Sequence, residues 1–514
     1  MSITQDWTEG YVSGIEYTQG YYHELNPLRS KLALINAGLQ PSEVSEFHCE
    51  LGYGLGISTN IHAAATQATW YGTDFIPSQA RFAQELSAYT SARSKLYDES
   101  FEEFCNRKDL PDFDSINLHG IWTWVSDKNR ACIVDFINRK LKVGGIVYLS
   151  YNSLPGWAGF SPIRHLMRMY EEYFCNKSMD TKAKVLGAKN FIEKYLALNP
   201  IFVINNPDIL ERFNAVKRQD AKYIAHEYFN AEWKPMYFNE VSNLLASAKL
   251  DFACSAYYFD HIREINFTLE QLKFIDGTQN QTFKELSKDY MTNQQFRRDY
   301  WVKGIRKISK SEQEMLQKKT GVVLIKPASE ISMKVRGTFE ADLNPRTYEP
   351  LINYLSDYKI RTIEEIAAKI CTKELSFEKV KNAILILHGQ GVMTTTQNEN
   401  LAIKSKITTD RFNKEVIERS KIDGSLNYLA SPVTGGGIGV GRFDQMFLLA
   451  KSNGVNNANA WAKSAWDIIS SKGEVIVKNG LELSTDNENI EELVSQANLF
   501  AKTRLPLLEA LHVI

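Results

Sequence analysis

The sequence lacks the features that mark disulfide-stabilised, zinc-binding and membrane-spanning proteins. Its six cysteines lie far apart in 514 residues and form no C-x-x-C pair, which argues against a disulfide framework and a structural zinc site. No run approaches the roughly 20 apolar residues that span a bilayer. The start, MSITQDWTEGYVSG, has no basic segment followed by an apolar one, so no signal peptide is expected. We therefore expect a cytoplasmic protein without membrane insertion and without a bound metal.

The charge balance favours no particular class of partner. Formal net charge is -1, from 60 Lys and Arg against 61 Asp and Glu, so the total attracts neither nucleic acid nor an anionic membrane. Hydrophobic residues make up 44% and charged residues 24%, which is typical of a globular protein with a sizeable core. The length predicts about three or four domains.

A glycine-rich turn is the first informative motif. The stretch EFHCELGYGLGISTN reads as a short buried strand, a turn with Gly52, Gly54 and Gly56, and the start of a helix. A phosphate-binding P-loop would need Gly-Lys-Ser/Thr, and a dinucleotide site would need glycine where Ile57 stands. The pattern present is E-x-G-x-G-x-G, beginning at Glu50.

The segments after this turn continue the pattern of an α/β domain. WYGTDF (70–75) reads as the next strand and ends in Asp74, 22 residues after Gly52. An acidic side chain at that distance accepts hydrogen bonds from ribose hydroxyls. Further strands are expected over 96–104, 114–125 and 144–152, with helices between them. This alternation predicts a parallel, doubly wound, Rossmann-like sheet.

The E-x-G-x-G-x-G motif followed by Asp74 resembles the first motifs of class I methyltransferases that use S-adenosylmethionine (SAM). The resemblance implies SAM as the cofactor, with adenine near the end of the third strand and the SAM carboxylate near His119. A Rossmann-like domain with another ligand is the alternative. The implied cofactor-binding residues are Glu50, Gly52, Gly54, Gly56, Asp74, Phe75, Ser100, Phe101 and His119.

Acceptor-side groups are expected at the ends of the fourth and fifth strands. Neither Asp/Asn-Pro-Pro-Tyr nor a catalytic Pro-Cys occurs there, which disfavours nucleic-acid bases as acceptors. In YLSYNSLPGW (148–157), Tyr151 and Asn152 could hold an amine or carboxamide by hydrogen bonds, and His119 could act as a base. Trp122 and Trp157 could line an alkyl chain, whereas Trp124 is assigned to the core. Core packing remains the alternative for Trp122, Tyr151 and Asn152, and a structural role for His119.

Several longer segments together resemble one group of bacterial methyltransferases that join the SAM domain to a methyltransferase regulatory region. They are SGIEYTQGYYHELNP (13–27), LHGIWTWV, YNSLPGW, HEYFNAEWKPMYFNEV (226–241), FRRDYWVKG (296–304) and SPVTGGGIGVGRFDQMFL (431–448). The similarity is greatest to the rickettsial protein-lysine methyltransferases that modify an outer-membrane protein. It implies transfer to lysine side chains of a protein and a homodimer.

Lysine must lose its proton before transfer, and burial among aromatic side chains lowers the pKa of its ammonium group. Trp122, Trp157, Tyr223 and Tyr228 are the candidates for this substrate channel, with Tyr151 beside them. Methylation of a sugar or small metabolite is a second hypothesis, and a SAM-sensing protein without catalysis is a third.

The expected domain organisation has six parts. They are an N-terminal helical cap over the SAM site (1–44), the SAM-binding core (45–160), a helical insertion for dimerisation or capping (161–224), the rest of the core (225–275), a middle or linker region (276–340), and a helical C-terminal regulatory or substrate-docking domain (341–514), winged-helix-like at 347–397.

Three local patterns complete these expectations. Residues 297–336 carry 11 Lys and Arg against 4 Asp and Glu. This stretch is interpreted as a solvated face, with attraction of an acidic partner as the alternative. The last helix of the winged-helix-like part is mostly apolar, which favours a packing or docking module over a DNA reader. A second glycine-rich stretch, TGGGIGVGRF (434–443), is interpreted as a mobile loop.

Overall fold

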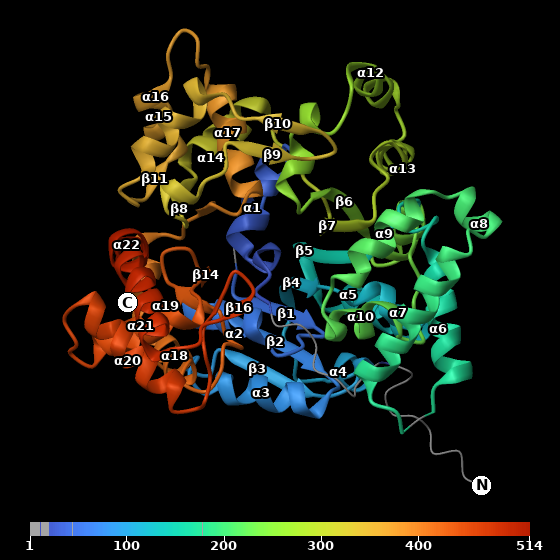
Figure 1. The fold of residues 1–514 in the computed structure, drawn as a ribbon. Helices are drawn as coiled ribbons and strands as arrows, with labels where there is room; N and C mark the ends of the chain where they lie inside the picture. Colours follow the sequence, from blue (N-terminus) through green and yellow to red (C-terminus); the bar gives the residue numbers. More distant parts are fainter. Residues whose placement is uncertain (1–10, 12–19, 44, 177) are drawn as a thin grey trace.

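A seven-stranded sheet forms the centre of the computed structural model, which describes residues 11, 20–43, 45–176 and 178–514 (Figure 1). The strand order is β3-β2-β1-β4-β5-β7-β6. Strands β1 to β5 are parallel, and β7 runs antiparallel between β5 and β6. The strands are β1 (Phe47–Leu51), β2 (Thr69–Asp74), β3 (Ser94–Asp98), β4 (Phe113–Leu118), β5 (Leu141–Asn152), β6 (Leu250–Ser255) and β7 (Phe296–Lys303). The expected Rossmann-like α/β class is confirmed.

The order of the strands fixes where a ligand can bind. The chain leaves β1 towards β2 on one side, whereas β4 pairs with β1 on the other. Ligands of such sheets bind in the crevice beyond the carboxyl ends of the two strands at this reversal. The glycine turn follows β1 directly, so it lies at this crevice.

Helices connect these strands, and their first residues explain where they begin. Pro77 stands in the first turn of α3, Ser100 and Glu103 form a capping box on α4, and the Ser126 side chain caps α5. The capping box ends the third strand earlier than expected, so 101–105 is helix. The helices are α2 (Ile57–Ala65), α3 (Pro77–Ser87), α4 (Phe101–Cys105), α5 (Asp127–Lys140) and α11 (Phe238–Ala246).

The seventh strand corrects two expectations. β7 falls inside 276–340, which was expected to be a middle or linker region, so the sheet extends to Lys303. α12 (Leu269–Gly277) and α13 (Gln281–Thr292) precede it. Arg297 on β7 is buried among three carboxylates. It therefore does not belong to a solvated basic face.

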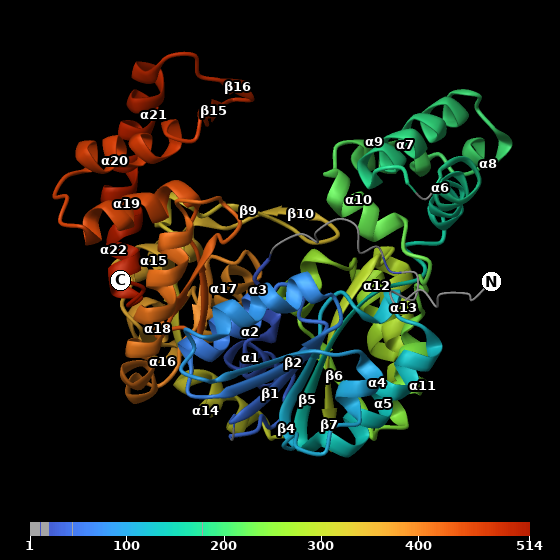
Figure 2. The same ribbon diagram turned by 90° about the horizontal axis from the view of Figure 1, so that it is seen from below.

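The insertion between β5 and β6 is helical, as expected. Figure 2 shows its helices as a lobe to one side of the sheet, opposite the C-terminal helices. The lobe has its own apolar core, which includes Met167, Ile192 and Phe213. Its helices are α6 (Ser161–Phe174), α7 (Thr181–Ala197), α8 (Ile201–Ile204), α9 (Asp208–Lys217) and α10 (Ala221–Tyr228).

The N-terminal region contributes one α-helix, α1 (Pro27–Asn36), after the short 3-10 helix η1 (His23–Leu25). The Asn26 side chain accepts a hydrogen bond from Leu28 N and caps α1. This helix contacts β6 and the C-terminal elements α14 (Lys310–Lys319) and β12 (Met393–Thr395). Residues 1–10, 12–19 and 44 of the expected cap over the cofactor site (1–44) lie outside the described residues.

The region after β7 is largely helical, with small sheets. A three-stranded antiparallel sheet has the order β11-β8-β12, and β9 pairs with β10. Three helices occupy the region 347–397, where a winged-helix-like part was expected. A single strand, β12, follows α17, and it pairs with β8. A winged-helix likeness is therefore not shown. The elements are β8 (Gly321–Leu324), β9 (Lys334–Arg336), β10 (Glu340–Asp342), α15 (Pro345–Leu355), β11 (Arg361–Thr362), α16 (Ile363–Ile370), α17 (Phe377–Gly389) and α18 (Glu399–Arg419).

The second glycine-rich stretch is packed against α2, so the mobile-loop interpretation is wrong. It forms the hairpin of β13 and β14, which contacts α2. His62 Nδ1 on α2 lies 3.1 Å from the Gly435 carbonyl oxygen. A Cβ on Gly436 would lie 2.3 Å from the Tyr21 hydroxyl oxygen, so these glycines permit close packing. The last elements are β13 (Tyr428–Ser431), β14 (Gly436–Gly439), α19 (Arg442–Ser452), α20 (Ala458–Ser470), β15 (Val477–Lys478), β16 (Leu481–Glu482), α21 (Asp486–Leu499) and α22 (Leu505–Ala510).

Among the residues that the structure describes, no helix combines the length and the hydrophobicity that a bilayer crossing requires. All six cysteines are free thiols.

Candidate active site at the glycine turn

The glycine turn has a backbone that other residues adopt with strain. Gly52 has a φ of +72°, and a Cβ there would lie 2.2 Å from Cδ1 of Ile121. Gly56 has a φ of +64° at the start of α2, and a Cβ there would lie 2.6 Å from that of Ala83. Glycine at these two positions therefore allows the left-handed turn and the close approach of Ile121, which follows β4, and of α3.

Asp74 connects the end of β2 to this turn. Its Oδ2 accepts a hydrogen bond from Gly54 N at 2.8 Å, and its Oδ1 accepts one from Ile76 N at 3.0 Å. Burial raises the pKa of this carboxyl to about 7. Each oxygen of a carboxylate can accept two hydrogen bonds, so Asp74 holds the turn and still has acceptor capacity for a ligand.

Glu50 is a second buried carboxyl below the turn. Its Oε2 accepts a hydrogen bond from the Thr59 hydroxyl, and burial raises its pKa to about 8. A cation placed beside Glu50 would favour the ionised form and lower this pKa. The environment therefore suits a cationic ligand.

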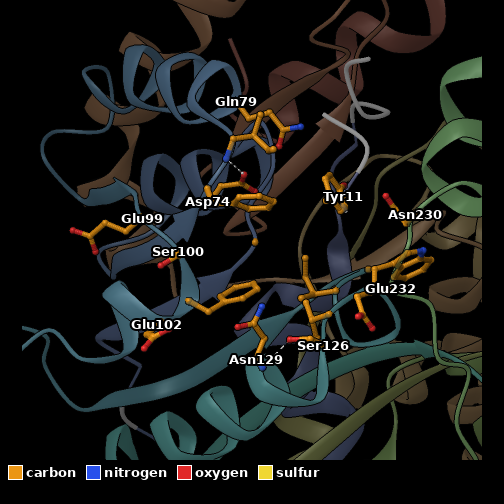
Figure 3. Close-up of a pocket in the computed structure, with 18 residues that line it drawn as sticks. Tyr11, Asp74, Gln79, Glu99, Ser100, Glu102, Ser126, Asn129, Asn230 and Glu232 are labelled. Carbon is orange, nitrogen blue, oxygen red and sulfur yellow. Dashed lines mark hydrogen bonds between the residues drawn. The ribbon is translucent and has the colours of Figure 1, made fainter. Parts of the chain in front are cut away.

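Two adjoining cavities open at this edge of the sheet. The turn cavity lies against the glycines and includes Glu50, Ser58 and His119 in its wall. The large cavity extends past Asp74 towards the strand end of β3 and the residues after α10 (Figure 3). Residues that line both cavities are Tyr11, Gly52, Asp74, Gln79, Gly120 and Ile121.

The large cavity has two sides that come from different parts of the chain. Figure 3 shows Asp74 and Ser100 on one side, and Asn230 and Glu232 on the other. Phe75, Ser100 and Phe101 all line it, so the residues predicted around the cofactor lie together.

Tyr11 and Trp124 also line the large cavity, although the sequence had not assigned them to it. The Tyr11 ring lies 5.7 Å from that of Phe75, edge to face, and 5.6 Å from that of His226. The WTW motif indicates that a tryptophan lies near the site, but the sequence alone does not decide whether Trp122 or Trp124 lines the cavity. Asn230 and Glu232 lie inside the segment 226–241 that carried the family resemblance, without a separate signal of their own.

His119 lies in the wall of the turn cavity. Its Nδ1 is 2.9 Å from the Tyr148 hydroxyl oxygen, and its ring stacks on Tyr22 with centroids 3.5 Å apart. Burial lowers its pKa to about 4, so the imidazole is neutral at physiological pH. A neutral imidazole can donate or accept one hydrogen bond at its other nitrogen.

Tyr151 and Asn152 point to opposite sides of β5, since successive side chains of a strand alternate. Tyr151 is buried in the core, and its hydroxyl donates to Asp299 Oδ2 at 3.2 Å. The structure therefore corrects the placement of Tyr151 at the reacting groups. The side-chain amide of Asn152 donates to Glu227 Oε1 at 3.0 Å, and burial raises the pKa of Glu227 to about 7.

The predicted substrate channel is not where the large cavity lies. Trp122 is fully buried in the core beneath the sheet, whereas Trp124, assigned to the core, lines the large cavity. The two stand on a 3-10 helix, η2 (Trp122–Trp124), which turns side chains two residues apart to different sides. Trp157 and Tyr228 pack in the core of the insertion, and Tyr223 is half-buried on α10.

These residues fit S-adenosylmethionine. Gly52 and Gly54 bring bare backbone to the cavity, and Glu50 and Asp74 supply buried carboxyls that a sulfonium cation and ribose hydroxyls would satisfy. No Lys or Arg, whose charge would repel the sulfonium, lines either cavity within the part of the chain that the structure describes.

Comparisons with known proteins agree with this site. Residues 220–303 match a family described as predicted methyltransferase regulatory domain. The uncharacterized protein sll1526 of Synechocystis sp. is 37% identical over 99% of both chains. The uncharacterized protein RP789 of Rickettsia prowazekii is 24% identical over 76% of this chain and 74% of its own.

One solved structure has the same fold over the full length. It is PKMT2 from Rickettsia typhi in complex with AdoHcy, the demethylated product of SAM. The match covers 97% of this chain and 100% of that chain, at 17% identity and a TM-score of 0.67. Taken with the regulatory-domain match and the glycine-turn site, it shows that this chain belongs to the class I SAM-dependent methyltransferases that carry a methyltransferase regulatory domain.

Proposed function

We propose that this protein transfers methyl groups from SAM to lysine side chains of a protein substrate. The observation that carries the proposal is the charge of the large cavity. Among the described residues, its lining includes four carboxyl groups and no Lys or Arg: Asp74, Glu99, Glu102 and Glu232. Such a cavity attracts a primary ammonium group.

Two of these carboxylates are already neutralised by bases outside the cavity. Glu99 pairs with Arg107 at 2.6 Å, and Glu102 pairs with Lys128 at 2.6 Å. Glu232 is exposed at the opposite side and forms no ion pair with the described residues. Glu232 is therefore our candidate for first contact with the substrate ammonium. The full-length fold similarity to PKMT2 from Rickettsia typhi supports the same acceptor.

Bound SAM supplies a methyl group on a sulfonium, which an amine nitrogen can displace in line. The chain has to orient both partners and exclude water. In this proposal, Asp74 holds the ribose, Ser100 and Phe101 flank adenine, and neutral His119 donates a hydrogen bond to the SAM carboxylate. Gly52 lets the backbone approach the ligand.

The substrate ammonium must lose a proton before it can react, because its ordinary pKa is about 10.4. We assign Glu227 to hold this proton. It is buried, its pKa is about 7, and it is three residues from Asn230 in the cavity wall. Asn152 positions Glu227 through the bond to Oε1. Trp124 and Tyr11 supply the aromatic walls that the sequence had placed at Trp122, Trp157, Tyr223 and Tyr228.

We also propose a homodimer that uses the helical insertion. Large apolar side chains on this lobe are more than half exposed: Tyr173, Phe174, Leu198, Ile201 and Ile204. Leu198→Glu should convert a dimer to a monomer in light scattering. Leu269→Glu is the matched control, because Leu269 is equally exposed on α12 outside the lobe, at 73% against 77%. Equal masses for both variants would remove the lobe from the interface.

The acceptor can be identified by transfer of a labelled methyl group. Purified protein is incubated with tritiated SAM and with soluble and envelope proteins of its source organism. Labelled proteins are then hydrolysed to amino acids. We expect label in methyl-lysine, and the family resemblance directs attention to outer-membrane proteins. Label in glycan or small molecules would instead support the metabolite hypothesis, and SAM binding without transfer would support the sensor hypothesis.

Glu232→Gln tests the assigned cavity in the same assay. We expect KM for the labelled protein to rise several-fold, while the Kd for SAM stays unchanged. Glu270→Gln is the control, because Glu270 is an exposed glutamate on α12 outside the cavity. Equal KM in both variants would exclude Glu232 from substrate contact.

A further inference from the structure

A second polar cavity lies within the regulatory domain, away from the glycine turn. It has a volume of about 200 Å³ and is enclosed by β6, β7, α13 and the residues between them. All of its lining residues fall inside 220–303, the range that matches the regulatory-domain family. We call it the β7 cavity.

Three buried carboxyl groups in this wall share one guanidinium. Arg297 Nη1 lies 2.6 Å from Asp289 Oδ1, and Arg297 Nη2 lies 3.3 Å from Glu285 Oε2. Arg297 also donates to both oxygens of Asp299, at 2.8 and 3.1 Å. Lys288 adds one more cation, 2.7 Å from Glu285. Among the described residues, three carboxyl groups thus face two bases, so the acidic groups outnumber the basic ones by one.

The missing partner belongs at Asp289. This side chain is 2% exposed, and its Oδ2 accepts no hydrogen bond from any residue that the structure describes. Burial and the neighbouring Asp299 and Glu285 raise its pKa to about 7, against the effect of Arg297. The other arginine in the wall, Arg298, is directed to Glu24 at 2.8 Å. A buried acceptor without a donor is costly, and a cationic donor would satisfy it.

The wall favours an organic cation over a metal ion. No group of three or more His, Cys, Asp and Glu that could hold a metal occurs among the described residues, and Arg297 occupies the point where the carboxylates converge. Phe252, Cys254 and Phe267 give the cavity an apolar side.

We propose that the β7 cavity is a ligand site for a small compound with a primary ammonium group. The ammonium donates to Asp289 Oδ2, and a short alkyl chain lies against Phe252 and Phe267. The site would give the regulatory domain a ligand of its own, separate from SAM and from the methyl acceptor.

n-Pentylamine is a suitable probe, and neutral 1-pentanol is its matched control. Calorimetric titration of the full chain should show saturable binding of the amine and none of the alcohol. Asp289→Asn should weaken amine binding at least tenfold. Asp276→Asn, at a carboxylate paired with Arg263 on the surface, should leave it unchanged. All titrations use a Glu232→Gln background, because Glu232 is our proposed contact for a primary ammonium group in the large cavity.

Several results would overturn the proposal. They are equal binding of amine and alcohol, equal amine affinity with and without Asp289→Asn, or no saturable binding of the amine in the Glu232→Gln background. Circular dichroism checks that Asp289→Asn is folded. If it is not, the amine and alcohol titrations in the Glu232→Gln background decide the matter alone.

Discussion

Replacement of Asp74 by alanine should weaken SAM binding through two effects that the geometry separates. The first is the loss of hydrogen bonds from the ribose hydroxyls. A hydrogen bond to a charged group is worth about 1.5–3 kcal/mol, so one or two such bonds correspond to about 1.5–6 kcal/mol. Since about 1.4 kcal/mol is a factor of ten in affinity, Kd should rise at least about tenfold. The second effect is release of the turn, because Gly54 N and Ile76 N lose their acceptor.

Isothermal titration calorimetry with SAM measures the change, and Asp98→Ala is the matched control. Asp98 ends the neighbouring strand directly beside Asp74 in the β2–β3 register, but it is exposed and lines neither cavity. Its replacement should leave Kd within about twofold of wild type. If Asp74→Ala is folded and binds SAM as tightly as Asp98→Ala, the ribose assignment is refuted.

Three further predictions follow from burial. Folded Glu50 holds its proton up to about pH 8, whereas unfolded glutamate releases it near 4.3. The free energy of unfolding of the ligand-free protein should therefore fall as pH rises from 6 to 8. In thermal melts, Glu50→Gln should lose less stability over this range than the wild type. An equal loss in both proteins would contradict this prediction. Tyr151→Phe removes the hydrogen bond to Asp299 and should lower the free energy of unfolding by about 1.5–3 kcal/mol. SAM affinity and the rate of methyl transfer should stay unchanged. Slower transfer at unchanged stability would instead indicate that Tyr151 acts in the active site. Trp122→Ala should cost about 3–5 kcal/mol of stability, whereas Trp124→Ala should keep the fold and raise KM for the labelled protein; the reverse pattern would contradict the assignment.

The parts of the site that the sequence predicted depend on local spacing. The turn from Glu50 to Gly56 and the distance to Asp74 are set by one strand–turn–helix–strand unit, so a short window contains the necessary information. The alternation of strands and helices up to Asn152 is likewise local.

The parts that were missed depend on contacts between distant segments. β7 pairs with β5 although about 140 residues separate them, and no pattern in FRRDYWVK distinguishes a central strand from a linker. The register of β5 in the sheet decides which side of the strand Tyr151 faces. The geometry of a short 3-10 helix decides which tryptophan of WTW lines the large cavity. The packing of Gly436 against Tyr21 joins segments about 400 residues apart.

A crystal structure with AdoHcy tests the central claim most directly. We predict AdoHcy in the two adjoining cavities, with its ribose hydroxyls within hydrogen-bonding distance of Asp74, adenine beside Ser100 and Phe101, and the homocysteine part towards His119. AdoHcy bound elsewhere, or in the reverse orientation with adenine at His119, would contradict the account of this site.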